Sequence, residues 1–396
     1  NTYNRLNTLA SVSCPFCAMV CDDLSLPLHN EQTIPQQVIC EKAVTGFTRA
    51  LEATRAMPLL KGKEITWTEA LTKAGALLRE AQHPLIHGLI GDLIDSKAAH
   101  KLAEHFAGTV DHRHGDAIAR NLRIYQQGGW QISSMGEVRN RADLVILLSD
   151  DLETTLPRLK EKVLQSEARL HASAPPTVYM LDDSRLETLS ILRARLSNKP
   201  LQTDTSATDE LLSLINKADY PVFMIGPLQD KATELIIRTC VGLVRDMNEQ
   251  QRCALLLLGT GEGDITAQLS GAWHNGFGIR TSFTKGYPVQ DLQMHSGDRL
   301  LQSGESDLLV WISTLSSDPP PNVTQPTIVI GHPAMTFKTD PPELFLPVSI
   351  PGIHRAGYLH RADGLRMVPL NALIESPLSS SAALCEQLIA QEPRPC

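Results

Sequence analysis

Short apolar runs separated by amphipathic segments are the feature that most limits how this chain can fold. The runs are rich in Val, Ile and Leu, are bounded by Gly, Ser, Asp or Pro, and lie at residues 84–90, 144–149, 177–183, 221–226, 254–259, 308–313 and 327–331. Strands that are buried on both faces of a parallel sheet have this composition. Apolar residues recur three and four positions apart at 67–82, 96–108 and 231–248, which is typical of helices. The alternation predicts an α/β fold with several parallel-sheet subdomains.

The length of the chain predicts more than one domain. At 396 residues it exceeds what a single hydrophobic core usually serves. Residues 1–57 do not follow the strand–helix rhythm and are expected to form a small cysteine-rich lobe. Residues 58–200 and 201–345 are predicted to be two α/β domains, and residues 346–396, which are irregular and strand-like, a C-terminal closing segment.

Charge and hydropathy exclude two broad classes of partner. The formal net charge is −8 and no basic run is present, so nucleic acid is not an expected ligand. No apolar stretch approaches the roughly 20 residues that span a bilayer, so no membrane partner is expected. The first residues, NTYNRLNTLASVS, lack an apolar signal core, and a cytoplasmic location is therefore expected.

Four of the eight cysteines are clustered near the start of the chain. Cys14, Cys17, Cys21 and Cys40 are spaced as C-x2-C-x3-C-x18-C. In a reducing compartment, clustered cysteines indicate metal or cluster ligands before disulfides. Four thiolates that converge on one centre hold a [4Fe–4S] cluster, whereas zinc usually takes two C-x2-C knuckles, which are not present here. We predict an iron–sulfur site at these four residues, with zinc and four merely buried cysteines as the alternatives.

Three longer phrases carry a family resemblance. They are CPFCAMVCDDL, GEVRNRADLVILLSDD and RADGLRMVPL, and the C-x-K of Cys40 to Lys42 accompanies them. Together they resemble the family of formylmethanofuran dehydrogenase B subunits, which belongs to the molybdopterin oxidoreductases, and in particular the B subunits of formyltransferase/hydrolase complexes. The similarity extends from Cys14 to about Leu370. It implies a multi-subunit complex in tetrahydromethanopterin-linked formaldehyde oxidation, with a methanofuran-type carrier, and it places Lys42 between cluster and pterin.

The chain departs from this family where the metal is held. The family binds a tungsten or molybdenum bispterin through the first residue of a Cys-His-Gly phrase; here His114 and Gly115 match, but Arg113 takes the ligand position. A guanidinium has no lone pair to offer a metal. We therefore expect no molybdopterin or tungstopterin. We interpret residues 112–114 as a polar loop at a strand end, and the alternative is that Arg113 and His114 bind an anion such as a polyglutamate tail.

A second departure lies in IHRAGYLHRADG, residues 353–364. The family reads roughly Glu-x-x-Gly-Thr here, and this chain has His354 and Tyr358 at the acidic and Thr positions. Arg361, Gly364 and Arg366 fit the family pattern. His354 and His360 are expected to be solvated loop histidines.

Two candidate phosphate-binding turns are weak. The glycines of LLLLGTGEGD, residues 255–264, follow a strand and could cradle an anion through backbone N–H groups, although such clusters are often only turns. In IGPLQDK, residues 225–231, Pro227 removes a donor where the family has a glycine-rich turn.

Two main functional hypotheses follow, and a zinc-stabilised interaction module is the third. The first is a subunit that has lost its metal–pterin and acts as a scaffold for partner subunits that carry out formyl transfer and hydrolysis. The second is an active molybdenum or tungsten formylmethanofuran dehydrogenase subunit that passes electrons through a [4Fe–4S] cluster. Residues 270–288 carry Trp273, Phe277, Phe283 and Tyr287. We expect this segment to contact a partner or line a carrier channel, with packing inside the core as the alternative.

Overall fold

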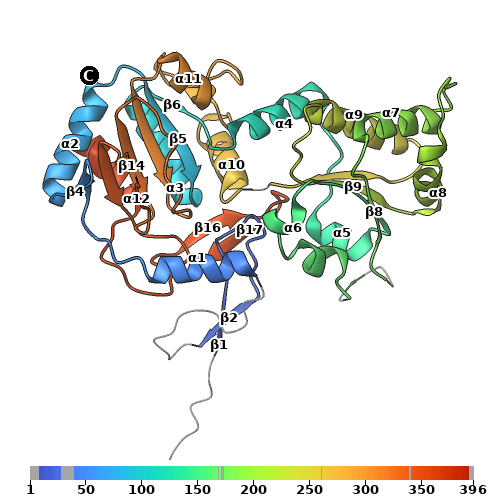
Figure 1. The fold of residues 1–396 in the computed structure, drawn as a ribbon, viewed down its shortest axis with the longest axis horizontal. Coiled ribbons are helices and arrows are strands. Elements are labelled where there is room, and N and C mark those ends of the chain that lie inside the picture. Colours follow the sequence, from blue (N-terminus) through green and yellow to red (C-terminus); the bar gives the residue numbers. More distant parts are fainter. Residues whose placement is uncertain are drawn as a thin grey trace, which may run out of the picture. The chain divides into compact units, whose positions relative to one another are not determined.

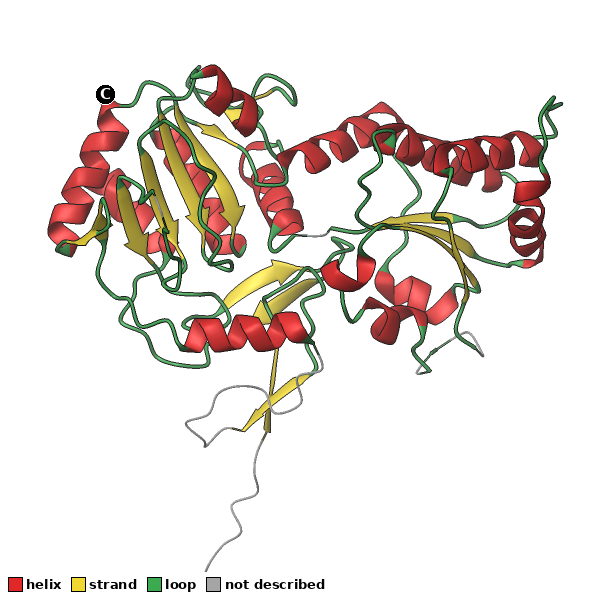
Figure 2. Cartoon of the chain, viewed as in Figure 1, coloured by secondary structure: helices red, strands yellow, loops and turns green. Residues whose placement is uncertain are grey.

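The computed structural model describes residues 9–27, 40–167, 169–170, 174–259, 261–338 and 340–391. The chain forms two compact units, which we call unit 1 (residues 1–119 and 261–396) and unit 2 (residues 120–260). Each unit contains a sheet with parallel strands and helices packed against it (Figures 1 and 2). The predicted α/β class is confirmed. Within the described ranges, no helix is both long enough and apolar enough to cross a membrane.

The sheet of unit 1 has the order β12-β11-β6-β5-β13-β14-β15-β3-β4. Its central strands β6, β5, β13, β14 and β15 are parallel, whereas β12, β11, β3 and β4 add antiparallel edges. The strands are β3 (Leu59–Leu60), β4 (Lys63–Glu64), β5 (Pro84–Ile90), β6 (Thr109–Val110), β11 (Thr281–Ser282), β12 (Val289–Gln290), β13 (Leu308–Ser313), β14 (Thr327–Gly331) and β15 (Leu344–Pro347). The apolar runs predicted at 84–90, 308–313 and 327–331 are all buried strands.

Separate hydrophobic clusters cover the two faces of this sheet. On one face, α2, α3 and α12 pack over Ile86, Val310 and Ile328, and Figure 1 shows α12 and α3 on the sheet. On the other face, Leu85, Leu309 and Val329 pack with α11 and the hairpin β16–β17. The elements are α2 (Trp67–Glu80), α3 (Leu93–His105), α10 (Asp264–Asn275), α11 (Gly297–Ser303), β16 (Gly357–His360), β17 (Met367–Leu370) and α12 (Ser381–Gln391).

The N-terminal residues belong to unit 1. They comprise the hairpin of β1 (Leu9–Val12) and β2 (Leu24–Pro27) and helix α1 (Glu41–Leu51). The ring of Phe16 packs edge-on against Phe47 of α1, with ring centroids 5.0 Å apart. Gly46 lets that ring approach, because a Cβ there would lie 2.2 Å from it.

Unit 2 has a four-stranded sheet of order β10-β9-β7-β8, with all pairs parallel. Its strands are β7 (Leu144–Leu148), β8 (Thr177–Met180), β9 (Pro221–Ile225) and β10 (Ala254–Leu257). Its helices are α5 (Met135–Arg141), α6 (Leu152–Thr155), α7 (Arg185–Leu196), α8 (Asp209–Lys217) and α9 (Thr233–Met247), with a π-turn at Lys160–Leu164 and a 3-10 turn at Ser206–Thr208. Helix α4 (Gly115–Gly128) runs from unit 1 into unit 2. The core of unit 2 packs α7, α8 and α9 over Ile146, Phe223 and Leu255.

The structure differs from the sequence-based expectations at three places. The run at 177–183 gives β8, an edge strand that pairs only with β7 and has largely exposed side chains. Residues 346–396 contain helix α12 as well as strands. The units also divide at 119/120 and 260/261 rather than at the predicted boundaries after 57, 200 and 345, because β13 pairs with β5 across more than two hundred residues.

Candidate functional site

The order of strands in unit 1 reverses between β5 and β13. From β5 the chain passes through α3 to β6 on one side, whereas β13 on the other side leads on to β14 and β15. In open α/β sheets, ligands bind outside the carboxyl ends of the strands at such a switch point. We therefore place the candidate site at the carboxyl ends of β5, β6 and β13.

The end of β5 is shaped by a bulge and by close backbone approach. Gly88 and Leu89 both have positive φ, at 86° and 53°. A Cβ at Gly88 would lie 2.8 Å from the carbonyl oxygen of Ile312, so only glycine fits there. The register with β13 shifts at the same level, between Ile312 and Ser313.

A buried carboxylate anchors the segment that follows β6. Asp111 is 1% exposed and accepts hydrogen bonds from the backbone N–H of Gly297 (2.7 Å) and of His112 (2.8 Å). The Arg280 Nε–H donates to the same carboxylate at 3.2 Å. Burial raises the pKa of Asp111, although the positive charges of His87 and Arg280 oppose that rise. This network holds the start of α4 against α11.

The next three residues differ in environment. His112 is 1% exposed, and its Nδ1 accepts from the N–H of His114 (2.9 Å), so Nε2 carries the proton of the neutral ring. His112 Nε2 and His114 Nδ1 are buried without a hydrogen-bond partner in the described structure. Burial, then the nearby charges of His114, His87 and Arg113, hold the pKa of His112 well below its ordinary value of 6.5. Residues 112–114 lie in a loop directly after β6, in line with the expected polar loop at a strand end, but His112 within that loop is buried.

Arg113 points to the surface. Its side chain is 39% exposed and its Nη1 donates to Asp318 at 3.2 Å. Its backbone N–H donates to the carbonyl of Gly88 at the β5 bulge (3.1 Å). Arg113 thus lies beside the switch point and offers a cation, with no lone pair for a metal.

A buried ion-pair cluster joins the β5–α3 turn to the segment before β16. Asp92 and Asp95 form a capping box at the start of α3 and are 0% and 1% exposed. Arg355 donates to Asp92 Oδ1 at 3.0 Å and Oδ2 at 3.1 Å, and to Asp95 Oδ1 at 2.5 Å. Burial, then the neighbouring charge of Asp95, raises the pKa of Asp92 to about 6. The Thr314 hydroxyl also donates to Asp95, at 2.5 Å, so this cluster ties β13 to the same point.

The cluster positions the second segment in which the chain departs from the family. The N–H of Tyr358 donates to Asp92 (3.2 Å), and the Tyr358 side chain is 44% exposed. His354 is half-buried, and its Nδ1 accepts from the N–H of Ile350 (3.1 Å). His360 is 7% exposed in β16, so the expectation of a solvated loop is wrong for it: the strand pairing carries its ring into the interior.

The glycines predicted as a possible anion cradle serve close packing in unit 1. A Cβ at Gly263 would lie 2.3 Å from the carbonyl oxygen of Gly91, and one at Gly261 would lie 2.3 Å from the His114 ring. The N–H of Gly261 donates to Asp264 at 3.0 Å. The loop therefore fits against the β5–α3 turn, and one of its N–H donors is already used.

The switch point of unit 2 lies between β7 and β9 and is filled by the chain itself. Asp150, just after β7, accepts from the N–H of Gln229 (2.6 Å) and pairs with the buried Arg185 (2.7 Å). Its own N–H donates to the carbonyl of Pro227 (2.8 Å). A Cβ at Gly226 would lie 2.6 Å from the Ser149 hydroxyl. Groups that could otherwise bind a phosphate are therefore paired internally.

The cysteines of the N-terminal cluster lie close together. Cys14, Cys17 and Cys21 are buried in one loop, closed by a hydrogen bond from the Cys14 N–H to the Cys21 carbonyl (2.8 Å). Cys40 is half-buried at the N-cap of α1. Burial, then the charge of Cys21, raises the pKa of Cys17 to about 12; the charge of Lys42, in the first turn of α1, opposes this. Burial and the other three cysteines likewise raise the pKa of Cys14 well above 9.0.

The arrangement does not by itself form a metal site. In the part of the chain that the structure describes, no three His, Cys, Asp or Glu side chains are grouped so as to hold a metal ion. We derive no electron-transfer step through these side chains. Ligation by Cys14, Cys17, Cys21 and Cys40, and a cofactor role for Lys42, Arg113 and His114, stay predictions.

The RADGLR phrase contacts the cysteine loop. Arg361 and Arg366 both pair with Asp22, the residue after Cys21, at 3.1 and 3.0 Å. The N–H of Ala362 donates to the carbonyl of Ala18 at 2.7 Å. Two of the phrases that carry the family resemblance thus meet in space.

Comparison with known proteins agrees with this fold. No family model matches the chain. It is 23% identical to the B subunit of the tungsten-containing formylmethanofuran dehydrogenase 2 of Methanocaldococcus jannaschii, over 94% of this chain and 95% of that one. It is 25% identical to the B subunit of the formyltransferase/hydrolase complex Fhc of Methylorubrum extorquens, over 76% of this chain and 87% of that one.

A solved structure supports the fold as a whole. The crystal structure of the formyltransferase/hydrolase complex FhcABCD from Methylorubrum extorquens with methylofuran contains a chain that matches with a TM-score of 0.71. The sequence identity is 22%, and the match covers 84% of this chain and 98% of that one. The chain is thus similar in sequence to B subunits of the formylmethanofuran dehydrogenase type and similar in fold to a chain of the FhcABCD complex. Among these B subunits is the Fhc B subunit, which belongs to a multi-subunit complex.

Sequence reasoning missed the ion-pair clusters around Asp92 and Asp111. The D-x-x-D spacing after the 84–90 run is a capping-box pattern and could have marked Asp92 and Asp95 as the start of α3. No signal in the sequence links Arg355 to Asp92 or Arg280 to Asp111, because each pair joins elements more than 160 residues apart.

Proposed function

We propose that this chain is the B subunit of a formyltransferase/hydrolase complex in one-carbon oxidation linked to tetrahydromethanopterin. In this proposal it has no metal–pterin chemistry of its own. It is a scaffold that binds sister subunits, which carry out formyl transfer and hydrolysis on a methanofuran-type carrier. The complex is expected in the cytoplasm.

The observation that carries the proposal is Arg113. By resemblance, its position is where the dehydrogenases hold tungsten or molybdenum through a thiolate. Here the side chain is a surface cation paired with Asp318, and a guanidinium cannot coordinate a metal. The internal pairing of Asp150 with Arg185 in unit 2 supports the same reading.

The partner surface that we propose includes residues 270–288. Trp273 and Tyr287 are 63% and 58% exposed, whereas Phe283 is buried at 3%. The segment is therefore divided: Phe283 belongs to the core, and Trp273 and Tyr287 are free to contact a sister subunit or the carrier. Large exposed aromatic residues of this kind are enriched at interfaces.

The test is metal analysis combined with activity. The chain is co-expressed with its sister subunits in a host that makes metal–pterin, and tungsten and molybdenum are measured alongside formyl transfer, formyl-carrier hydrolysis and formate oxidation with a viologen dye. We expect transfer and hydrolysis, with neither metal nor dye reduction. About one tungsten or molybdenum per chain, together with formate oxidation, would instead establish the dehydrogenase function.

A further inference from the structure

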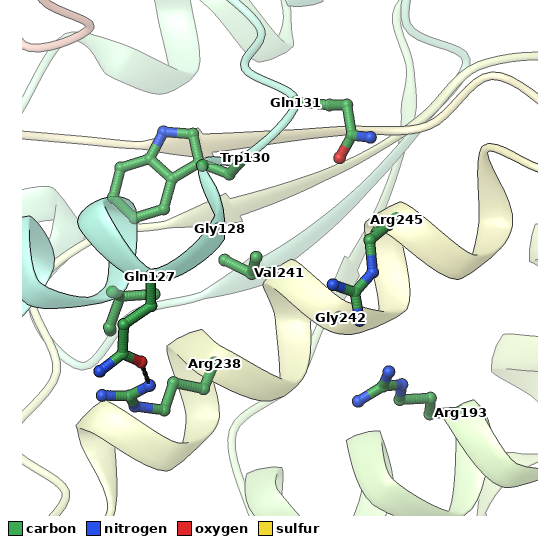
Figure 3. Close-up of a pocket in the computed structure, with 11 residues that line it drawn as sticks. Gln127, Gly128, Trp130, Gln131, Arg193, Arg238, Val241, Gly242 and Arg245 are labelled. Carbon is green, nitrogen blue, oxygen red and sulfur yellow. Dashed lines mark hydrogen bonds between the residues drawn. The ribbon is translucent and has the colours of Figure 1, made fainter.

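Unit 2 contains a pocket of about 420 Å³ that the proposed function does not use. It is bounded by the end of α4, by α7 and by α9 (Figure 3). Arg193 of α7 and Arg238 and Arg245 of α9 line it together with Gln127 and Trp130 from the α4 end. Helix α9 follows β9, so these α9 residues, from its middle to its last turn, lie away from the carboxyl ends of the strands. The pocket is therefore distinct from the unit 2 switch point.

The pocket carries excess positive charge. Glu234 is shared between Arg123 (2.8 Å) and Arg238 (2.7 Å), and Asp246 pairs with Arg193 through Nε at 2.6 Å. Arg245 lies 3.8 Å from Asp246, which is longer than a hydrogen bond. Two carboxylates thus serve four guanidinium groups, three of which line the pocket. Arg238 also donates through Nη1 to Gln127, so the N–H donors left for solvent or a ligand are mainly those of Arg193 and Arg245.

One glycine gives Arg193 its position. A Cβ at Gly242 would lie 2.5 Å from Arg193 Nη1 and 2.6 Å from its Cζ. The guanidinium therefore rests directly on the backbone of α9, with Nε turned to Asp246. Figure 3 shows Gly242 between the guanidinium groups of Arg193 and Arg245. Any side chain at position 242 would push Arg193 aside.

The cations are spread along a line rather than focused on one point. Arg238 and Arg245 are seven residues apart on one helix, which is about 10 Å at 1.5 Å per residue. A ligand with two separated anionic groups can contact both side chains. Guanidinium forks match the geometry of phosphate and carboxylate oxygens. The side-chain amide of Gln131, which also lines the pocket, is a further donor.

We propose that this pocket, which we call the arginine pocket (Gln127, Trp130, Arg193, Arg238, Gly242 and Arg245), binds an anionic small molecule with at least two oxyanion groups. The groups are phosphates or carboxylates, which share the same recognition chemistry. The proposal rests on unit 2 alone and is independent of the function proposed above.

The test is isothermal titration calorimetry on the full chain in its co-expressed complex, with pyrophosphate and citrate as probes. We expect at least one of them to bind. Preference for pyrophosphate assigns a phosphorylated ligand, and preference for citrate a polycarboxylate; either supports the site. Arg193→Gln and Arg245→Gln should each weaken binding about tenfold or more, since a hydrogen bond to a charged group is worth about one such factor.

Two further variants separate a built site from general positive charge. Gly242→Ala keeps the net charge but displaces Arg193, and should weaken binding as Arg193→Gln does. Arg252→Gln removes an exposed, ion-paired arginine of unit 2 outside the pocket, and should leave binding unchanged. Circular dichroism checks that each variant is folded. If Gly242→Ala does not fold, the effect of Arg245→Gln on binding decides whether the pocket is a specific site. No binding of either probe, or equal weakening by Arg252→Gln, would overturn the proposal.

Discussion

Removal of the Arg355 guanidinium should strongly destabilise unit 1. Arg355 is 15% exposed and pairs with two carboxylates that are 0% and 1% exposed. Loss of one partner from a buried ionic cluster typically costs about 3–5 kcal/mol, because the remaining charge is left uncompensated. We expect Arg355→Met to lower the free energy of unfolding by about that amount at pH 8.

The pH dependence follows from Asp92. Its pKa is already raised to about 6 in the folded chain, mainly by burial. A raised carboxyl pKa means that the folded state holds its proton more tightly than the unfolded state, so the stability contribution is present at low pH and is lost as pH rises through about 6. Removing Arg355 takes away the charge that lowers this pKa. Arg355→Met should therefore lower the free energy of unfolding less at pH 5 than at pH 8, because at pH 5 Asp92 is protonated in the folded state.

The assay is urea-induced unfolding at both pH values, with two matched variants. Arg366→Met removes an arginine that is 61% exposed and pairs with Asp22; a surface pair of this kind is worth at most about 1 kcal/mol. The triple variant Arg355→Met, Asp92→Asn, Asp95→Asn removes all three charges and should recover much of the loss, since Asn is also a good N-cap. The reasoning fails if Arg355→Met costs no more than Arg366→Met, or if its cost is the same at pH 5 and pH 8.

Three other predictions concern the cysteine loop, the metal position and the partners. The buried Cys17 thiol has a pKa of about 12, against an ordinary value of 9.0. At pH 8 iodoacetamide should therefore alkylate it about a thousandfold more slowly than an ordinary thiol, because the thiolate is the reactive form. Mass spectrometry that finds Cys17 modified as fast as the half-buried Cys40 would contradict this. Arg113→Cys should not create viologen-linked formate oxidation in a host that supplies metal–pterin, because the internal pairing in unit 2 remains; measurable oxidation would refute that. Expressed alone, the chain should aggregate or unfold at a lower temperature than when it is co-expressed with its sister subunits. The double variant Trp273→Ser, Tyr287→Ser should reduce the stabilisation that co-expression gives. A stable monomer with no affinity for those subunits would count against the scaffold.

The parallel sheets were predictable because their strands are continuous apolar runs. Residues 84–90 and 308–313 are buried along their whole length as β5 and β13. The division into units was not predictable in the same way. It depends on β13 returning to β5 after unit 2 is complete, and pairing between segments so far apart leaves no local pattern in the sequence.

The candidate site was predictable only where a family phrase marked it. The Cys-x-x-Cys loop and the RADGLR phrase were recognised separately, and the structure joins them through Asp22. The burial of His112 was not foreseen, because D-H-R-H-G reads as a polar loop. Its environment is made by Asp111 and Arg280, which hold the segment in the interior. A charged phrase can be buried whenever distant partners satisfy it, and local composition does not reveal them.

The cysteine loop and the candidate metal position bear on the proposed function in different ways. Arg361 and Arg366 pair with Asp22 beside the cysteine loop, and Phe16 packs on α1. Arg113 lies at the surface and pairs with Asp318, and Asp150 pairs with Arg185 in unit 2. In the resemblance that we propose, Arg113 takes the position of the metal ligand, and a guanidinium has no lone pair to offer tungsten or molybdenum. The scaffold that we propose is compatible with both observations, because packing around the cysteine loop requires no electron transfer.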